Sequence, residues 1–308
     1  MAAPRVLFIV GPTASGKTAA SLELSAHARI EIVNSDSRQV YRDMSIGTGK
    51  PTSAELASVP HHLIDVATPD EGYNLTRFLS EARAAIADIA SRDTVPVVVG
   101  GTGQYVWGLV EGWRAPAVPP NPELRAELAE EARRSSPEAL HGRLRAVDVK
   151  AADTIDPRNV RRVIRALEVW YETGAAFSRQ RRKSPPGFEP VLLGIAPERA
   201  ALRQRADNRV DAMLNNGWPE EVRQLLDAGY SPDLPSFSSV GYREVASYMN
   251  GELTVEEPAE RLKKATHRLI RRQAAWFKAG DPRITWSPDA TSLAASVLAM
   301  CFPSRSTP

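Results

Sequence analysis

The N-terminal part of the chain contains eight residues whose types and spacing predict a phosphate-binding loop. They match the pattern G-x-x-x-x-G-K-[ST] and are Gly11, Pro12, Thr13, Ala14, Ser15, Gly16, Lys17 and Thr18. In such a loop, glycines let main-chain N–H groups converge on an anion at the start of a helix, and the lysine adds a point charge. The hydroxyl of Thr18 is a candidate Mg²⁺ ligand. The alternative is a glycine-rich turn without a ligand, but the apolar run before Gly11 supports the strand-loop-helix context of a phosphate site.

Two further polar segments are candidates for the same site. Residues 34–41 (NSDSRQVY) and residues 100–105 (GGTGQY) each follow a short apolar run. Ligands of an open parallel sheet bind beyond the carboxyl ends of its strands, so both segments should lie beside the phosphate loop. Asp36 is the candidate general base, with helix capping or water-mediated Mg²⁺ binding as its alternatives. Thr102 lies between glycines, where its hydroxyl can contact a ligand or complete a plain turn.

The elements that must position these segments are short strands alternating with helices. Apolar or β-branched runs occur at residues 5–10, 30–33, 63–66, 95–99 and 191–195. Residues 75–89 have the i, i+3, i+4, i+7 spacing of a helix with one buried face. After the last run, helices are expected at residues 200–216, 219–228, 240–250 and 258–279, without a further strand. The pattern predicts an α/β fold, with a P-loop NTPase-like parallel sheet flanked by helices.

The character of the sequence changes in the middle of the chain. Four prolines between residues 116 and 122 lead into charged helical patterns without a convincing strand. This change indicates a helical insertion into the sheet domain. We therefore expect a P-loop core domain formed by residues 1–115 and 187–308, and a helical insertion domain formed by residues 116–186.

Composition excludes several classes of protein. With 308 residues, 43% hydrophobic and 25% charged, the chain is typical of a compact globular protein. No apolar run approaches the roughly 20 residues that span a bilayer, so no membrane association is expected. Cys301 is the single cysteine, which excludes an internal disulfide and agrees with a reducing, cytoplasmic compartment. A monomer is expected.

Cations gather in two segments, although the net charge of the chain is only +2. The first cluster comprises Arg158, Arg161, Arg162, Arg165, Arg179, Arg181, Arg182 and Lys183, and the second comprises Arg261, Lys263, Lys264, Arg268, Arg271 and Arg272. Such clusters attract the phosphate backbone of a nucleic acid. For either cluster alone, a solvated helix face is an equally good interpretation.

The ordered set of motifs resembles the tRNA dimethylallyltransferases, also called tRNA isopentenyltransferases or IPP transferases. The resemblance rests on GPTASGKT at 11–18, NSDSRQVYRDMSIGTGKPT at 34–52, HHLID at 61–65, VGGTGQY at 99–105, NVRRVIRALEVWYETG at 159–174, the arginines of LRQRADNRVDAML at 202–214, VGYRE at 240–244 and RRQAAWFK at 271–278. Each piece except the phosphate loop is weak by itself. Together they cover nearly the whole chain in one order, which makes the resemblance specific.

The resemblance implies transfer of a dimethylallyl group from dimethylallyl diphosphate to N6 of the adenosine 3′-adjacent to the anticodon, position 37 of the tRNA, with release of diphosphate. The phosphate loop would hold the leaving diphosphate, with Mg²⁺ as cofactor near Thr18, directly or through water. Asp36 would accept the N6 proton, Thr102 would orient the adenine or the diphosphate, and Arg209 would stabilise charge on the diphosphate. Three alternatives are a small-molecule or nucleoside kinase that binds ATP in the loop, an enzyme that prenylates free adenine nucleotides, and a non-catalytic NTPase switch bound to RNA.

The resemblance also implies that the partner is the anticodon stem-loop of tRNA, from which the adenosine must be extruded. The predicted tRNA-binding residues are Ser37, Arg38, Gln39, Gln104, Arg161, Arg162 and Arg165. The first three follow the general base and would read the base and its neighbours, whereas the last three would clamp the stem backbone. Gln104 stands where the family usually has an apolar residue, which could alter the shape of the pocket. For Arg165, a structural ion pair is the alternative.

Overall fold

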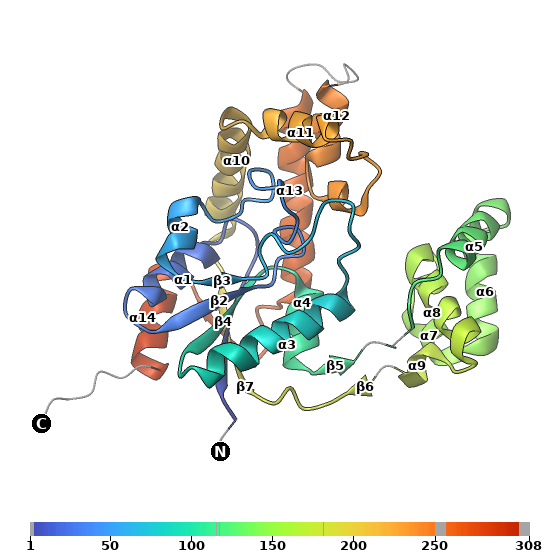
Figure 1. Ribbon diagram of the computed structural model, residues 1–308, viewed down its shortest axis with the longest axis horizontal. Helices are drawn as coiled ribbons and strands as arrows, with labels where there is room; N and C mark the ends of the chain where they lie inside the picture. Colours follow the sequence, from blue (N-terminus) through green and yellow to red (C-terminus); the bar gives the residue numbers. More distant parts are fainter. Residues whose placement is uncertain (1–2, 115, 117, 181, 250–256, 302–308) are drawn as a thin grey trace, which may run out of the picture. The chain divides into compact units, whose positions relative to one another are not determined.

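The chain divides into two compact units in its computed structural model (Figure 1). Unit 1 consists of Met1–Val110 with Pro186–Pro308, and unit 2 consists of Glu111–Pro185. The sequence predicted junctions after residues 115 and 186, and the assignment of the insertion to tRNA contact stays a prediction. The residues that the structure describes are 3–114, 116, 118–180, 182–249 and 257–301.

A parallel six-stranded sheet forms the centre of unit 1, in the order β3-β2-β4-β1-β7-β8. Its strands are β1 (Arg5–Val10), β2 (Ile30–Asn34), β3 (His61–His62), β4 (Val95–Gly100), β7 (Glu189–Ile195) and β8 (Ile284–Ser287). β1 lies between β4 and β7, with Val10 level with Gly100 on one side and with Gly194 on the other. The predicted α/β class with a parallel sheet is therefore confirmed. The segments after β1, β2 and β4 leave the sheet at the same edge.

The strand pattern predicted from the sequence was wrong in two places. Residues 63–66 were expected to form a strand, but β3 ends at His62. Leu63 and Asp65 have φ angles of 63° and 55°, in the left-handed region that a strand cannot use. Two elements were not predicted from the sequence: strand β8, whose four residues (ITWS) lack a long apolar run, and helix α14 (Ala290–Cys301) after it.

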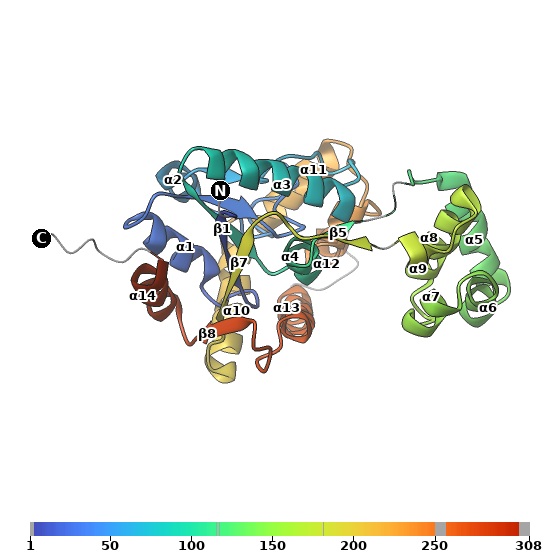
Figure 2. The same ribbon diagram turned by 90° about the horizontal axis from the view of Figure 1, so that it is seen from below.

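Helices cover both faces of the sheet (Figure 2). α1 (Lys17–Ser25) and α14 pack on one face, where Leu24 and Val297 join the apolar side chains of β1 and β4. α3 (Leu75–Ser91) packs on the other face and carries the expected apolar stripe of a half-buried helix. Phe78 of this helix stacks on Tyr105 of α4 (Gly103–Val110), with ring centroids 3.8 Å apart. The sheet is thereby fixed on both sides.

A second core of unit 1 is built by helices from the C-terminal half of the chain. These are α10 (Arg199–Asn215), α11 (Trp218–Asp227), η1 (Pro235–Ser238), α12 (Tyr242–Met249) and α13 (Glu257–Trp276). They bury Trp218, Phe237 and Tyr242 together with Val40 and Met44 from the segment that follows β2. That segment continues into α2 (Ser53–Ser58). This second core thus holds in place the loop that carries the candidate general base.

Unit 2 is helical, as the sequence predicted, with one short strand pair added. Its elements are β5 (Trp113–Arg114), α5 (Pro122–Arg134), α6 (Pro137–Val147), α7 (Val149–Thr154), α8 (Val160–Thr173), α9 (Phe177–Gln180) and β6 (Arg182–Lys183), which pairs antiparallel with β5. Leu128, Leu140 and Leu167 are among its buried residues.

Within the described part of the chain, no helix is long and apolar enough to cross a membrane.

Candidate active site

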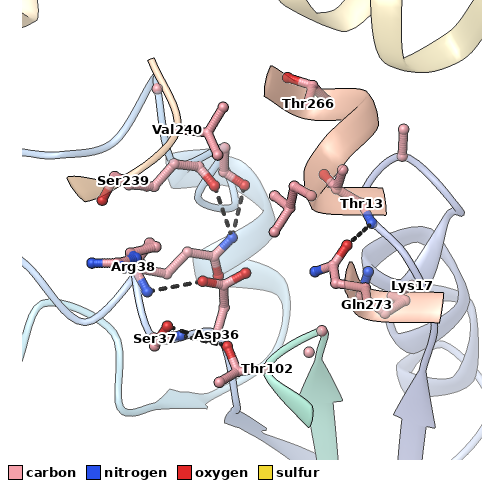
Figure 3. A pocket seen from close by; sticks show the side chains of 18 of the residues that line it. Thr13, Lys17, Asp36, Ser37, Arg38, Thr102, Ser239, Val240, Thr266 and Gln273 are labelled. Carbon is pink, nitrogen blue, oxygen red and sulfur yellow. Dashed lines mark hydrogen bonds between the residues drawn. The ribbon is translucent and has the colours of Figure 1, made fainter. Parts of the chain in front are cut away.

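A cavity of about 620 Å³ lies where β1, β2 and β4 end (Figure 3). Its walls come from the three segments that the sequence analysis selected and from α10, α13 and residues 238–240. Figure 3 shows Asp36 and Thr102 on one side of the cavity and Lys17, Thr13 and Gln273 on the other. The sheet therefore brings the predicted groups of unit 1 to one place, as the strand-end rule requires.

The phosphate loop presents a partly desolvated cation to this cavity. Lys17 is the first residue of α1, and its Nζ donates a hydrogen bond of 2.7 Å to the carbonyl of Pro12. Burial lowers the pKa of Lys17 to about 8; Asp36 opposes the shift and Arg209 adds to it. The predicted loop residues that line the cavity are Thr13, Ala14, Gly16, Lys17 and Thr18, whereas Gly11, Pro12 and Ser15 are buried behind them. An anion bound here would meet a cation and a helix N-terminus together.

One oxygen of Asp36 stabilises a turn, as the capping alternative predicts, and the role of general base stays a prediction. Oδ1 accepts a hydrogen bond of 2.9 Å from the main-chain N–H of Arg38. Asn34 at the end of β2 accepts one of 3.0 Å from the N–H of Asp36, which orients the residue. Within the described residues, Oδ2 accepts no hydrogen bond. A carboxylate oxygen on the cavity wall is thus available to accept a proton.

Thr102 joins the loop after β4 to the loop after β2. Its Oγ1 accepts a hydrogen bond of 3.0 Å from the N–H of Ser37 and donates one of 3.3 Å to the Ser37 hydroxyl. The two loops approach so closely that a Cβ on Gly100 would lie 2.4 Å from the main chain of Ser35. Thr102 therefore fixes the residue next to Asp36 while it lines the cavity.

Arg209 enters the cavity from α10 and shares an acceptor with Gln39. The carbonyl of Gly49 accepts a hydrogen bond of 3.2 Å from Arg209 Nη2 and another of 2.9 Å from Gln39 Nε2. Burial lowers the pKa of Arg209, against the opposing effect of Asp36. The guanidinium is therefore held beside Lys17 and Asp36, where a bound polyanion would relieve the repulsion between the two cations.

Two residues that sequence reasoning missed hold these groups in place. Buried Glu221 accepts hydrogen bonds of 2.7, 2.6 and 3.2 Å from the successive N–H groups of residues 45–47, and its Oε1 accepts another from the hydroxyl of Tyr242. This fixes the segment that leads to Gly49. Gln273 of α13 accepts a hydrogen bond of 2.8 Å from the N–H of Thr13 in the phosphate loop. A glutamine within the apolar stripe of α13 is the signal that could have identified it.

The predicted tRNA-binding residues fall into two groups, and their roles stay predictions. Ser37, Arg38, Gln39 and Gln104 line the cavity of unit 1. In unit 2, Arg161 and Arg162 are exposed on α8. Arg165 forms the structural ion pair that the sequence left open: Nη1 lies 2.5 Å from the buried carboxylate of Glu168, and Nη2 donates to the carbonyl of Val118. The structure therefore supports the ion-pair interpretation for Arg165.

The oxygen atoms on the cavity wall fit a divalent cation whose other ligands are mostly water molecules and phosphate oxygens of a substrate. Among the described residues, no three His, Cys, Asp or Glu side chains converge on one point. Mg²⁺ commonly uses only one or two protein oxygens besides substrate phosphates. Thr18 and Asp36 supply such oxygens on the cavity wall, and the Ser15 hydroxyl is buried behind the wall without a partner in the described part of the chain.

Comparisons with known proteins agree with the resemblance seen in the sequence. The IPP transferase family model matches residues 39–280. The chain is 48% identical to the tRNA dimethylallyltransferase of Roseiflexus sp. (strain RS-1), with 94% of each protein covered, and 50% identical to that of Roseiflexus castenholzii with the same coverage. The chain therefore belongs to the IPP transferase family.

Solved structures with the same fold carry related names. The chain resembles the full-length tRNA isopentenylpyrophosphate transferase of Bacillus halodurans with a TM-score of 0.67 and 37% identity, covering 93% of this chain and 90% of that one. It resembles a eukaryotic dimethylallyltransferase acting on tRNA with a TM-score of 0.82 and 28% identity, covering 96% of this chain and 78% of that one. These relatives favour a prenyltransferase over the kinase alternative.

Proposed function

We propose that the protein transfers a dimethylallyl group from dimethylallyl diphosphate to N6 of the adenosine 3′-adjacent to the anticodon of tRNA, position 37, and releases diphosphate. One observation carries the proposal: a phosphate loop and an available carboxylate, Asp36, line one cavity of a chain that belongs to the IPP transferase family. A kinase would use the same loop for ATP, but β4 ends in Gly100 and leads into Gly101, without the carboxylate expected there.

The cations of the cavity act on the leaving group. The bond between the allylic carbon and the diphosphate oxygen breaks, and negative charge develops on that oxygen. Lys17, Arg209 and those N–H groups of the phosphate loop that have no partner within the protein stabilise this charge, and because they are already in place they need no rearrangement. Mg²⁺ near Thr18 supplies further charge neutralisation when bound. Since a neutral aromatic amine is a weak nucleophile, stabilisation of the leaving group is the larger part of the task.

Asp36 acts on the nucleophile. The lone pair of adenine N6 forms the new bond to the allylic carbon, and a proton leaves N6 for the unoccupied oxygen of Asp36. Thr102 keeps the loop of Asp36 in position through Ser37, which sets the direction of that oxygen. The products are the prenylated adenosine and diphosphate, and the proton passes from Asp36 to solvent.

The remaining assignments concern the partner. Ser37, Arg38, Gln39 and Gln104 on the cavity wall would contact the extruded adenosine and its neighbours. Arg161 and Arg162 would bind the backbone of the anticodon stem, and the insertion would serve as the tRNA-contacting domain. Arg165 is assigned to the core of unit 2. A cytoplasmic location and a monomeric state belong to the same proposal.

The experiment that tests the proposal compares acceptors for one prenyl donor. Purified protein is incubated with Mg²⁺ and dimethylallyl diphosphate, and with an anticodon stem-loop, AMP or ATP. Mass spectrometry should find one added C5H8 unit on the stem-loop and none on AMP. Prenylated AMP would indicate the enzyme of free nucleotides, and hydrolysis of ATP or phosphate transfer without prenylation would indicate a P-loop kinase or NTPase.

A further inference from the structure

The second cationic cluster of the sequence lies on α13 and has no task in the reaction described so far. Lys264, Arg268, Arg271 and Arg272 are exposed, and their spacing of four, three and one residues puts them on one stripe of the helix. Among the described residues, none of the four has a carboxylate within ion-pair distance. By contrast, the more buried Lys263 is paired with Asp211 at 2.8 Å. The positive charge of this exposed stripe is therefore available to a negatively charged partner.

Trp276 stands at the end of this stripe, one helical turn after Arg272. Both residues line the cavity, and 45% of the surface of Trp276 is exposed to solvent. One part of its indole rests on Gly103, because a Cβ at that position would lie 2.2 Å from the ring. Its main-chain carbonyl accepts a hydrogen bond of 3.0 Å from Trp107 Nε1. Trp276 is thus held in one position while a large part of its surface is open.

A fixed aromatic ring beside unpaired cations is the arrangement that binds single-stranded nucleic acid. Cations neutralise the phosphates, and the ring stacks on a base. Extrusion of an adenosine into the cavity leaves the bases on either side of it without a stacking partner. Trp276 lines the cavity that would receive this adenosine and is also exposed to solvent, so it can replace the lost partner of one neighbouring base.

We propose that Trp276 stacks on a nucleobase directly adjacent to the adenosine that enters the cavity, and that the α13 stripe of Lys264, Arg268, Arg271 and Arg272 binds the phosphates leading to it. The inference rests on the proposed function, since it needs RNA at this cavity. It adds a contact that the predicted tRNA-binding residues do not include. The ring reads stacking and not base identity, so it positions the loop without selecting its sequence.

Fluorescence of 2-aminopurine tests the stacking directly. Two stem-loops carry this base at the nucleotide 5′ or 3′ of the target adenosine, and each is titrated with protein. The wild-type protein should quench the 2-aminopurine fluorescence of one of the two stem-loops. Trp276→Ala should leave both bright and raise the KM for the stem-loop about tenfold, with the KM for dimethylallyl diphosphate unchanged. Trp276→Phe should restore most of the quenching. Met300→Ala, which removes an exposed apolar side chain of the same unit, should behave as wild type.

The stripe is tested by salt dependence. Arg268→Gln with Arg271→Gln should make the logarithmic salt slope of stem-loop binding shallower by about one to two. Arg199→Gln with Arg203→Gln removes the same charge from exposed positions of α10 and should leave the slope unchanged. Thermal unfolding of each variant checks that the fold is intact.

Several results would overturn the inference. If wild type prenylates the stem-loop while neither neighbour is quenched, or if Trp276→Ala equals Met300→Ala, Trp276 does not stack and the proposed function survives. If the wild-type protein transfers no prenyl group to the stem-loop, the proposed function is wrong, and the inference on Trp276 is wrong too. If Trp276→Ala changes the oligomeric state on light scattering but not RNA binding, the ring belongs to an interface between copies of this chain.

Discussion

Gln273 of α13 accepts a hydrogen bond of 2.8 Å from the main-chain N–H of Thr13, a residue 260 positions earlier in the phosphate loop. The glutamine is 7% exposed, so this N–H has a buried partner and is not available to an anion. The bond connects the loop that would hold the diphosphate with the helix that carries the second cationic cluster. The arrangement of the diphosphate site therefore depends on a residue far away in sequence.

Removal of this bond should weaken binding of the prenyl donor. Gln273→Leu removes the acceptor of the partly buried N–H of Thr13, and an N–H left without a partner costs about 1–3 kcal/mol when water cannot replace the acceptor. We expect the KM for dimethylallyl diphosphate to rise about tenfold, while the affinity for the stem-loop stays within twofold. Gln204→Leu on α10 removes an exposed glutamine of the same unit and serves as the control. An unchanged KM in Gln273→Leu would mean that the loop keeps its shape without this bond.

Asp36→Asn should affect turnover far more than RNA affinity. The amide oxygen can still accept from the N–H of Arg38, so the turn is preserved, but the side chain can no longer take a proton. General-base catalysis is worth about 10²–10⁴ in rate, so kcat should fall by at least about a hundredfold. Single-turnover rates and stem-loop Kd values measure the two effects separately, with Asp43→Asn at an exposed position of the same segment as control. Equal losses in rate and affinity would assign Asp36 to binding.

The pH dependence of donor use should report Lys17. Its pKa of about 8 means that the ammonium is charged at pH 7 and loses its proton as the pH rises through 8. Because the charged form binds the diphosphate, kcat/KM for dimethylallyl diphosphate should fall above pH 8, about tenfold per pH unit. Arginine stays protonated over this range, so Lys17→Arg should move the decline to higher pH even if its overall activity is lower. A flat profile from pH 7 to 10 in wild type would show that the charge of Lys17 is not needed.

Arg161 and Arg162 should contribute to RNA binding through charge alone. Their joint replacement by alanine should make the logarithmic salt slope of stem-loop binding shallower by about one to two, with kcat unchanged at saturating RNA. Arg133→Ala with Arg134→Ala removes two exposed arginines of the same unit that are paired with Glu130, and provides the matched control. If both double variants give the wild-type slope, Arg161 and Arg162 belong to the solvated surface.

The sequence predicted those parts of the site that depend on local pattern. The phosphate loop, the segment with Asp36 and the loop with Thr102 follow buried strands, and the order of motifs indicated the family. Parallel pairing of β1, β2 and β4 brings these segments together, which the strand-end rule anticipates. Arg209 was assigned by resemblance, and the structure brings it into the same cavity.

Contacts between distant segments could not be predicted in this way. Glu221 and Gln273 act on main-chain N–H groups of loops far away in sequence, and no local pattern specifies such partners. Strand β8 was missed because its four residues are too few for a clear alternation. The prediction of a strand at residues 63–66 was wrong because apolar content does not reveal a left-handed backbone at Leu63 and Asp65. In each case tertiary structure decided between local alternatives.

A labelling measurement identifies the atom that receives the prenyl group. Radiolabelled dimethylallyl diphosphate, Mg²⁺ and protein are combined with an anticodon stem-loop, or with the same stem-loop in which purine riboside, which has no N6 amino group, replaces the adenosine 3′-adjacent to the anticodon. We expect label in the adenosine stem-loop, absence of label in the purine riboside stem-loop, and release of one diphosphate for each prenyl group transferred. Equal labelling of both RNAs, or of neither, would contradict the proposed transfer to N6.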